Sequence, residues 1–180
     1  MFVAIDRTSK FAFVELHERA TRNVAADFLR KLVEIAPYKV HTVLTDNGTQ
    51  FTTPGNKYSM AKEIKQAWEK GERFRCHAFE SACAHLNIDH RLTKPNHPWT
   101  NGQVERMNRT LKEATVRRYY YSSHDQLREH LAAFINAYNY AKRLKTLKGL
   151  TPHEFIVKCW TEEPKRFNIN PNHHSAGLNI

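Results

Sequence analysis

Apolar residues recur at two spacings along the chain, and the spacings predict two kinds of element. In four short segments the apolar residues are consecutive or alternate between turn-forming residues, which is typical of strands. The predicted strands are residues 2–5, 11–16, 40–45 and 88–92. Elsewhere the apolar residues lie three and four positions apart, as on one face of a helix. The predicted helices are residues 21–36, 59–70, 77–86, 101–121, 123–143 and one that begins at Pro152.

The residues at the ends of these segments support the boundaries. Thr21 can cap the first helix, and Ser123 and Thr151 each precede a Gln or Glu by three positions, as in a capping box. Asp46-Asn47-Gly48 is a turn signal that stops the third strand. Strands that alternate with helices, followed by a helical C-terminal third, predict a three-layer α/β domain.

The order of elements also predicts how the chain is divided. Residues 1–121 contain the alternating strands and helices, and we expect them to form the core. Residues 122–160 are helical and are expected to pack on that core. Residues 161–180 are rich in Asn, Pro and His and are expected to form an extended tail.

The distribution of charge along the chain indicates the kind of partner that it binds. The chain has 180 residues, of which 41% are apolar, and a net charge of +10. Residues 91–148 hold 12 Lys and Arg against 4 Asp and Glu. Such a block favours a polyanion, most simply nucleic acid. A solvated basic face explains the charge equally well.

The start of the chain and its cysteines favour a cytoplasmic protein. The apolar run of residues 1–5 is too short for a signal peptide or a membrane span, so we expect no membrane partner. Three cysteines suit free thiols in a reducing cytosol.

The helix at residues 101–121 combines one carboxylate with several cations. Glu105, Asn108, Arg109 and Lys112 share one face at helical spacing, opposite the apolar residues. The cations suit phosphates, but Glu105 would repel a phosphate unless a metal ion lay between them. Mg²⁺ or Mn²⁺ prefers carboxylate, water and phosphate oxygens. A surface helix in which Glu105 pairs with Arg109 is the alternative.

Asp46 is the second carboxylate of interest because it closes a strand. Open α/β sheets place ligands at the carboxyl ends of their strands. The turn at Asn47-Gly48 leads the chain away and leaves the Asp46 side chain at the rim of the sheet. By itself, Asp-Asn-Gly is an ordinary turn.

Two long motifs connect these residues. Residues 44–51 read Leu-Thr-Asp-Asn-Gly-Thr-Gln-Phe, and residues 97–112 read His-Pro-Trp-Thr-Asn-Gly-Gln-Val-Glu-Arg-Met-Asn-Arg-Thr-Leu-Lys. They closely resemble the catalytic core of retroviral integrases and bacterial insertion-sequence transposases. These are the Asp-Asp-Glu enzymes with a ribonuclease H-like fold. The likeness covers residues 1–160 and includes Tyr138-Asn139, Arg143 and Leu150-Thr151-Pro152.

The resemblance implies a function and a site. Such enzymes cut and join DNA, and their carboxylates hold two divalent metal ions, Mg²⁺ or Mn²⁺, about 3.5–4 Å apart. By resemblance, Asp46 and Glu105 are the second and third acids of the triad. Four residues match positions expected to contact DNA: Asn101, Asn108, Arg109 and Lys112. The resemblance also implies homo-multimers on DNA, in the nucleoid of a bacterial cell. Residues 52–76 look like an insertion between the two acids.

The first acid of the triad has no match. In the family it lies on the first strand of a three-strand meander, whereas this chain has two strands before Thr21. We therefore expect Asp6 to be a turn residue that accepts backbone N–H bonds. We expect an N-terminally truncated domain that lacks the central strand, which leaves both neighbouring strands without backbone partners.

These observations leave three hypotheses. The chain is an active transposase core, or a catalytically inactive fragment that binds DNA and associates with intact transposase and inhibits it. The third is a fragment that does not fold stably.

Overall fold

The computed structural model describes residues 1–72, 76–94 and 101–173. The strands are β1 (Phe2–Ile5), β2 (Ala12–Glu15), β3 (Thr42–Thr45) and β4 (Asp89–Leu92). The α-helices are α1 (Arg22–Ile35), α2 (Ala61–Glu69), α3 (Ala78–His85), α4 (Gly102–Ala114), α5 (His124–Tyr140) and α6 (Pro152–Glu162). None of the helices in these ranges has the length and apolar character needed to cross a membrane.

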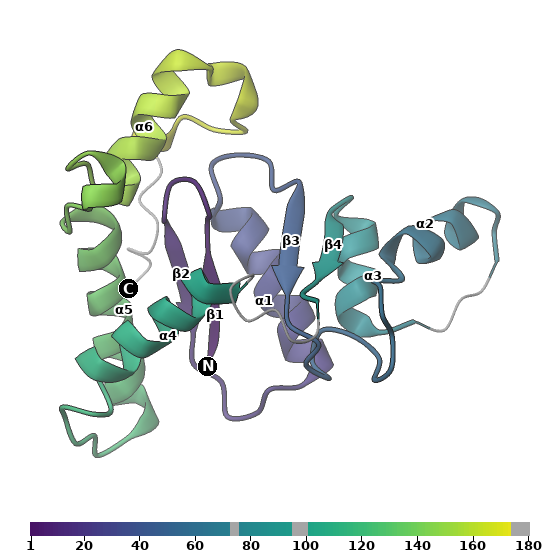
Figure 1. Cartoon of the computed structure of the whole chain (residues 1–180), viewed down its shortest axis with the longest axis horizontal. Helices are drawn as coiled ribbons and strands as arrows, with labels where there is room; N and C mark the ends of the chain where they lie inside the picture. The colour runs from purple at the N-terminus through teal and green to yellow at the C-terminus, as the bar shows by residue number, and fades with distance from the viewer. Residues whose placement is uncertain (73–75, 95–100, 174–180) are drawn as a thin grey trace.

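The strands form two separate two-stranded sheets rather than one. β1 and β2 are an antiparallel hairpin in which Phe2 pairs with Glu15 and Ile5 with Ala12. β3 and β4 are parallel, with Thr42 opposite Asp89. No ladder joins β1 to β3 among the described strands. In Figure 1, α1 lies behind the space between the two sheets.

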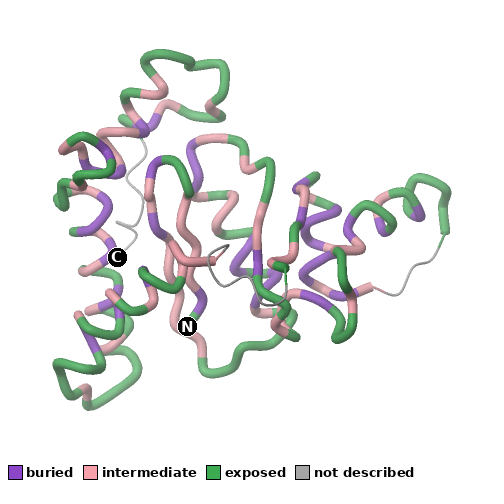
Figure 2. Tube along the Cα trace, viewed as in Figure 1, coloured by how far each residue is buried: buried purple, intermediate pink, exposed green. Residues whose placement is uncertain are grey.

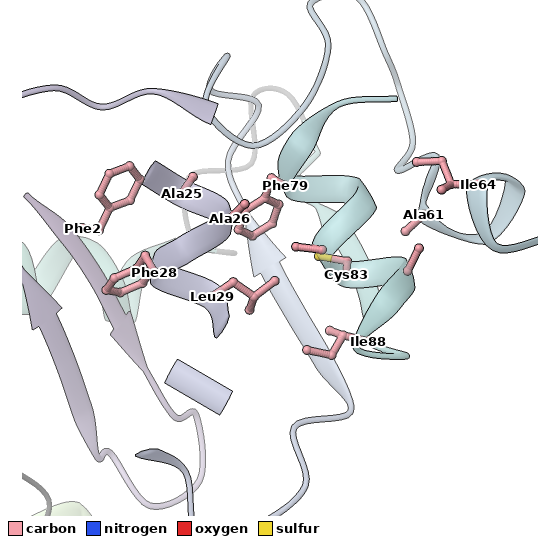
Figure 3. Close-up of a cluster of buried hydrophobic side chains, with 12 residues drawn as sticks. Phe2, Ala25, Ala26, Phe28, Leu29, Ala61, Ile64, Phe79, Cys83 and Ile88 are labelled. Atoms are coloured by element: carbon pink, nitrogen blue, oxygen red, sulfur yellow. The ribbon is translucent and has the colours of Figure 1, made fainter. Parts of the chain in front are cut away.

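One hydrophobic core lies between the sheets and helices α1, α2 and α3. Phe28 and Leu29 on α1 pack with Phe2 and Phe79, and Cys83 and Ile88 continue the cluster toward β4 (Figure 3). The rings of Phe13 and Phe28 stack with centroids 5.0 Å apart. This face of the hairpin is therefore closed by α1.

A second core covers the opposite face of the hairpin. Met107 and Leu111 on α4 and Leu131 on α5 pack there with Ala12, and Val3 and Ile5 adjoin them. The molecule therefore has helices on both sides of its strands, as Figure 1 shows, which confirms the predicted three-layer α/β arrangement. The buried residues, purple in Figure 2, lie on the sides of the helices that face the strands.

The outer edge of the hairpin is closed by a side chain. Asn139 on α5 accepts a hydrogen bond from the Ala12 N–H at 2.9 Å and donates to the Ala12 carbonyl at 2.8 Å. The amide thus takes the place of a neighbouring strand. Asn139 is buried, so these bonds form away from water.

The predicted helix caps are present with one difference. Thr21 accepts from Val24 N–H, and Thr151 and Glu154 form a complete capping box with Pro152 at the first helical position. Ser123 accepts from the Gln126 N–H, as predicted. The Gln126 side chain instead accepts from Ser122, so this capping box is shifted by one residue.

The prediction that the fourth helix reaches residue 121 was wrong. α4 ends at Ala114, and the Thr115 hydroxyl donates to the Leu111 carbonyl at 2.6 Å. This side-chain bond competes with the continuing helix ladder at a buried residue. The chain then turns, and Tyr119 and Tyr120 are exposed.

The segment after α6 is also more ordered than an extended tail. Short 3₁₀ turns cover residues 164–166 and 171–173. The Asn168 N–H donates to the Pro37 carbonyl at 2.8 Å, and Phe167 packs edge-on against Tyr38 at 6.0 Å between ring centroids. These contacts hold the segment against the start of the β3 region. Residues 174–180 of the predicted tail lie outside the described residues.

Candidate functional site

Asp46 lies at the carboxyl end of β3, as predicted. The preceding Thr45 is buried, and its hydroxyl is 2.8 Å from Nε2 of His90 on the neighbouring strand β4. Asp46 itself is exposed, and its Oδ1 accepts the Gly48 N–H at 2.9 Å. One carboxylate oxygen is thus fixed by the turn, and Oδ2 is left to face a ligand.

His90 anchors this strand end as a neutral ring. Burial, followed by the nearby His77, lowers the pKa of His90 to about 4, with a smaller opposing effect from Asp89. The ring stays uncharged at neutral pH and can keep its bond to Thr45. The packing of Phe79 against the ring, 5.1 Å between centroids, fixes its plane.

Asn47 has a role that the sequence did not reveal. Its side-chain amide donates to the Thr93 carbonyl at 3.2 Å, just beyond the end of β4. The bond ties together the ends of the two parallel strands next to Asp46. The Asp-Asn-Gly turn was visible in the sequence, but the partner depends on the pairing of β3 with β4.

Glu105 lies in the first turn of α4, which the opposite face of the helix holds in place. Met107 and Leu111 are buried in the second core. This packing leaves Glu105, Arg109 and Lys112 exposed and Asn108 half-buried, as the helical spacing predicted. Across the three described segments of the chain, no ion pair joins Glu105 to Arg109. The carboxylate is therefore available to a ligand.

The end of β3 and the start of α4 line the same cavity, which has a volume of about 1150 Å³. Asp46, Asn101, Gln103 and Val104 all line it. Glu105 follows Val104 directly but is not itself part of the lining. Lys10, from the hairpin turn, donates to the Gln103 side chain at 3.3 Å, a contact that joins segments far apart in sequence.

The basic face continues along α4 and past its end. Arg106, Arg109 and Lys112 are exposed. Arg117 is 3.7 Å from Glu113, and the Arg118 guanidinium lies 5.7 Å from the Tyr119 ring centroid. These are surface contacts that leave the cations open to a phosphate backbone. Residues 97–100 of the second motif lie outside the described residues.

Asp6 is a turn residue, which confirms the prediction made for it. Its carboxylate accepts from Thr8 N–H and Ser9 N–H, each at 3.1 Å, and from the Tyr38 hydroxyl at 3.1 Å. Burial, followed by the charge of Asp6, raises the pKa of Tyr38 well above its usual range, so the phenol remains a donor. Both Asp6 oxygens thus accept bonds from the residues around the turn.

Asp46, which lines the cavity, and Glu105, which follows the lining residue Val104, fit a hydrated divalent ion better than a protein cage. Asp46 and Glu105 each offer oxygen donors and are exposed. Mg²⁺ commonly binds one or two carboxylates plus waters and substrate phosphates. Within residues 1–72, 76–94 and 101–173, no three His, Cys, Asp or Glu side chains are grouped to hold a metal by themselves. Substrate oxygens would have to complete the coordination.

Comparisons with known proteins give a consistent picture. The fold is similar to the crystal structure of the catalytic core domain of BIV integrase, with a TM-score of 0.60 and 21% identity over 91% of this chain and 87% of that one. An uncharacterized protein of Caenorhabditis elegans is 26% identical over 117 residues. Those residues are 65% of this chain but 7% of the relative, so the chain spans a small part of that protein's length.

Two family matches cover most of the sequence. Residues 1–98 match an integrase core domain family, and residues 86–152 match a second family that is also described as an integrase core domain. The first match alone spans more than half of the 180 residues. The chain therefore belongs to the integrase core domain family.

Proposed function

We propose that this chain is the integrase core of a bacterial insertion-sequence transposase that cuts and joins DNA strands with Mg²⁺ or Mn²⁺. The observation that carries the proposal is the meeting of two elements at one cavity. The end of β3, with Asp46, and the start of α4, which bears Glu105, both open on it. Membership of the integrase core domain family supports the same chemistry.

Each carboxylate has a defined part in this proposal. Asp46 holds its ligand through Oδ2, because Oδ1 is bound by the Gly48 N–H. Glu105 acts from the first turn of α4, a helix whose Met107 and Leu111 pack against the hairpin. A metal ion between them would polarise the phosphate and activate the attacking hydroxyl.

The basic residues hold the DNA in this proposal. Arg109 and Lys112 lie one and two turns beyond Glu105 on the same face, where they meet backbone phosphates. Asn101 and Asn108 lie next to the carboxylate and can donate to phosphate or sugar oxygens. Such contacts position the strand without reading its sequence. Assembly as a homo-multimer on DNA belongs to the same proposal.

A second candidate function is DNA binding without cleavage, in association with an intact transposase that it inhibits. It is favoured by the side chains at the site. Asp6 is committed to its turn, and no third carboxylate joins Asp46 and Glu105 in the described part of the chain. A two-carboxylate site can bind a metal ion yet hold it too weakly for strand transfer.

One set of variants separates the two functions. For an active core, Glu105→Gln and Asp46→Asn each reduce Mn²⁺-dependent nicking of plasmid DNA by about 100-fold or more, since even indirect disturbance of metal ligands costs 10–100-fold. Glu113→Gln is the matched control, because Glu113 is an exposed acid of the same helix that pairs with Arg117. Nicking that survives both site variants contradicts the assignment of the site.

DNA binding is measured on the same variants. Arg109→Gln is expected to lower the slope of log affinity against log salt by about 1, the loss of one phosphate contact. Salt-sensitive binding without nicking identifies the second function. Binding that does not respond to salt contradicts both.

A further inference from the structure

The segment that joins α4 to α5, residues 115–123, carries a group of apolar side chains in water, and we call it the tyrosine turn. Seven large apolar side chains are exposed in the part of the chain that the structure describes, and three of them lie here within five positions: Val116, Tyr119 and Tyr120. The turn lies at a corner of the molecule (Figure 1) and is mostly green in Figure 2. Single exposed apolar residues are normal, but a group of them on one turn indicates a binding surface.

The tyrosine turn has a fixed backbone. Thr115 is buried, and its carbonyl accepts the N–H groups of Arg118 and Tyr119 at 2.8 and 2.9 Å. At the other end of the turn, the Gln126 side chain on α5 accepts from the Ser122 N–H at 2.8 Å. The side chains between these bonds are therefore presented in a set arrangement, so a ligand does not have to order the backbone that carries them.

Two of the three tyrosines are held by α5. The Tyr121 hydroxyl lies 2.6 Å from Nδ1 of His130. The rings of Tyr119 and Tyr121 lie 5.2 and 5.8 Å from the His130 imidazole, between centroids. The Arg118 guanidinium lies 5.7 Å from the Tyr119 ring centroid, a cation–π distance. These contacts give the turn a fixed cluster of rings on both sides of Tyr120 in the sequence.

Tyr120 presents its whole side chain to solvent. Its exposure is 104%, so the ring is as accessible as in an extended peptide. Within residues 1–72, 76–94 and 101–173, this side chain makes no ring contact, cation–π contact or hydrogen bond. A ring in water contributes nothing to stability, since it is burial that stabilises. The fold gives no reason for this ring, whereas a ligand that covers it does.

Cations surround the tyrosine turn. Residues 106–118 hold five Lys and Arg against one Glu, a net charge of +4. Arg117 pairs with Glu113 at 3.7 Å, while Lys112 and Arg118 are exposed and form no ion pair in the described ranges of the chain. A surface that combines cations with flat rings suits a polyanion that also carries flat rings, which is a nucleic acid.

The rings favour an unpaired strand over a duplex. In a duplex each base is stacked on its neighbours, so a side chain reaches only the base edges in the grooves. An unpaired base exposes its faces, and one of them can lie on the Tyr120 ring while a cation holds the adjacent phosphate. Stacking of this kind depends little on the identity of the base.

We propose that the tyrosine turn is a binding site for an unpaired DNA strand, in which one base stacks on Tyr120 while Arg118 and Lys112 hold the flanking phosphates. The hydroxyl of Tyr120 has no part in this contact, because stacking uses the face of the ring. Tyr119 supports the contact through the guanidinium that lies near its ring.

This site is separate from the carboxylates on the same molecule. Glu105 and Ala114 lie nine positions apart on α4, which is about 14 Å at 1.5 Å per residue. That length equals about four steps of a DNA strand at 3.4 Å per step. A strand whose reacting phosphate lies at Glu105 and which follows the basic face of α4 therefore reaches the turn about four nucleotides away or more. The inference rests on the proposed function for the presence of DNA, and its test uses binding alone.

A second copy of the chain fits this surface poorly. The same cations would face each other across such a contact, and each chain carries a net charge of +10. The cores of protein interfaces are depleted of charged residues, whereas Arg117 and Arg118 directly precede the tyrosines here. Charge complementarity therefore favours a nucleic acid as the occupant.

The test is fluorescence anisotropy of the full chain with a labelled oligothymidylate of about 12 nucleotides, a usual length for single-strand sites. EDTA is present, so that metal binding plays no part. Tyr120→Ala is expected to weaken binding about tenfold, the size of one base stack. Tyr120→Phe keeps the ring and is expected to keep the affinity. Tyr58→Ala is the matched control and should leave the affinity unchanged, because Tyr58 is an 80% exposed tyrosine that precedes α2.

Two further probes separate bases from phosphates. A strand of the same length without bases keeps the sugars and phosphates, and Tyr120→Ala should not change its affinity. A duplex of that length offers no free base faces, so its affinity should not change either. Arg118→Gln should weaken both single strands and lower the slope of log affinity against log salt by about 1, because it removes a phosphate contact.

Photochemical crosslinking locates the contact directly. An oligothymidylate in which iodouracil replaces one thymine is irradiated with the full chain, and the joined peptides are identified by mass spectrometry. The base is expected on the peptide that contains Tyr120 and not on the one that contains Tyr58. Excess unlabelled oligothymidylate should remove the product.

Three results would overturn the proposal. Tyr120→Ala binds oligothymidylate as tightly as the unchanged chain, or it loses as much affinity for the strand without bases. Alternatively, the chain self-associates in sedimentation without DNA and Tyr120→Ala abolishes this, which makes the turn a contact between copies. None of these results depends on nicking. Nicking with unaltered binding by Tyr120→Ala contradicts this inference alone, and the expected binding without nicking contradicts only the proposed catalysis.

Discussion

The two edges of the β1–β2 hairpin are treated differently. On the outer edge, the buried Asn139 amide satisfies both backbone groups of Ala12 at 2.8 and 2.9 Å. On the inner edge, Val3 and Ile5 line a cavity of about 1150 Å³, and no ladder joins β1 to β3 among the described strands. The strands belong to one hairpin and share two cores, so the difference lies in what covers each edge.

This difference shows that an open edge is a property of its surroundings and not of the strand. Unpaired backbone groups in a buried place are costly, so native proteins usually cover or block edges. The chain has such a device at β2, in a side chain that reaches over 127 positions of sequence. Along the inner edge of β1, no side chain of the described residues forms a pair of bonds of this kind.

The largest expected effect comes from opening the closed edge. Asn139→Leu removes both partners of Ala12 and leaves two buried backbone groups unsatisfied, at about 1–3 kcal/mol each. We expect a loss of about 4 kcal/mol in the free energy of unfolding, or roughly 10 °C in Tm, for a chain of this size. Urea and thermal denaturation followed by circular dichroism measure both.

Asn136→Leu is the matched control, since Asn136 is a half-buried asparagine one turn earlier on α5. It should change the free energy of unfolding by less than about 1 kcal/mol, as substitutions away from such networks do. Equal losses in the two variants would show that the Asn139 clamp contributes no more than general packing of α5.

The sequence predicted the layers of the fold better than it predicted the edges. Local patterns gave the hairpin, the caps at Thr21 and Thr151 and the two faces of α4, because each depends on neighbours in sequence. The clamp of Asn139 on Ala12 depends on how α5 crosses the hairpin, which no local pattern contains. α4 ends at Ala114, where Thr115 leaves the helical conformation and its hydroxyl bonds back to the Leu111 carbonyl, a bond that bends helices rather than one a periodicity reveals.

The candidate site divides in the same way. Asp46 and Glu105 stand out in sequence because turn and helix signals place them at the ends of elements. The bonds from Asn47 to Thr93 and from Lys10 to Gln103 link segments that meet only in the folded chain. The same holds for His90, whose partner Thr45 is on the adjacent strand.

An intermediate effect on the free energy of unfolding is expected from pH, through His90, which bonds to Thr45 at the end of β3. Burial, followed by His77, lowers the pKa of His90 to about 4 from its usual 6.5. A base whose pKa falls on folding stabilises the fold above its unfolded pKa, and this contribution is lost as pH falls from 6.5 toward 4. The shift corresponds to about 3 kcal/mol, measured as the free energy of unfolding between pH 7 and pH 4.

His90→Gln isolates this contribution from other groups that titrate in the same range, among them His77 and Asp89. The variant is less stable at pH 7, but the part of the pH dependence that belongs to His90 disappears. His124→Gln is the control, because His124 is exposed at the start of α5. If His90→Gln and the unchanged chain lose stability in parallel from pH 7 to pH 4, His90 is not the buried neutral base of this strand.

The smallest effect on stability, and the most specific one, is expected at the Asp46-Asn47-Gly48 turn that follows β3. A Cβ at Gly48 would meet the Gln50 side chain and lie 2.8 Å from Asp46 Oδ1, so Gly48→Ala must displace the Asp46 carboxylate. Both obstacles are side-chain ends, so the free energy of unfolding should fall by less than about 1 kcal/mol. Mn²⁺ affinity, measured by calorimetry, should fall by about tenfold, as when the support of a metal ligand is disturbed. Gly102→Ala is the control, since a Cβ there meets nothing within 4 Å. Gly102 starts the helix that bears Glu105, so equal Mn²⁺ affinity in the two variants would mean that the Asp46 turn does not position a ligand.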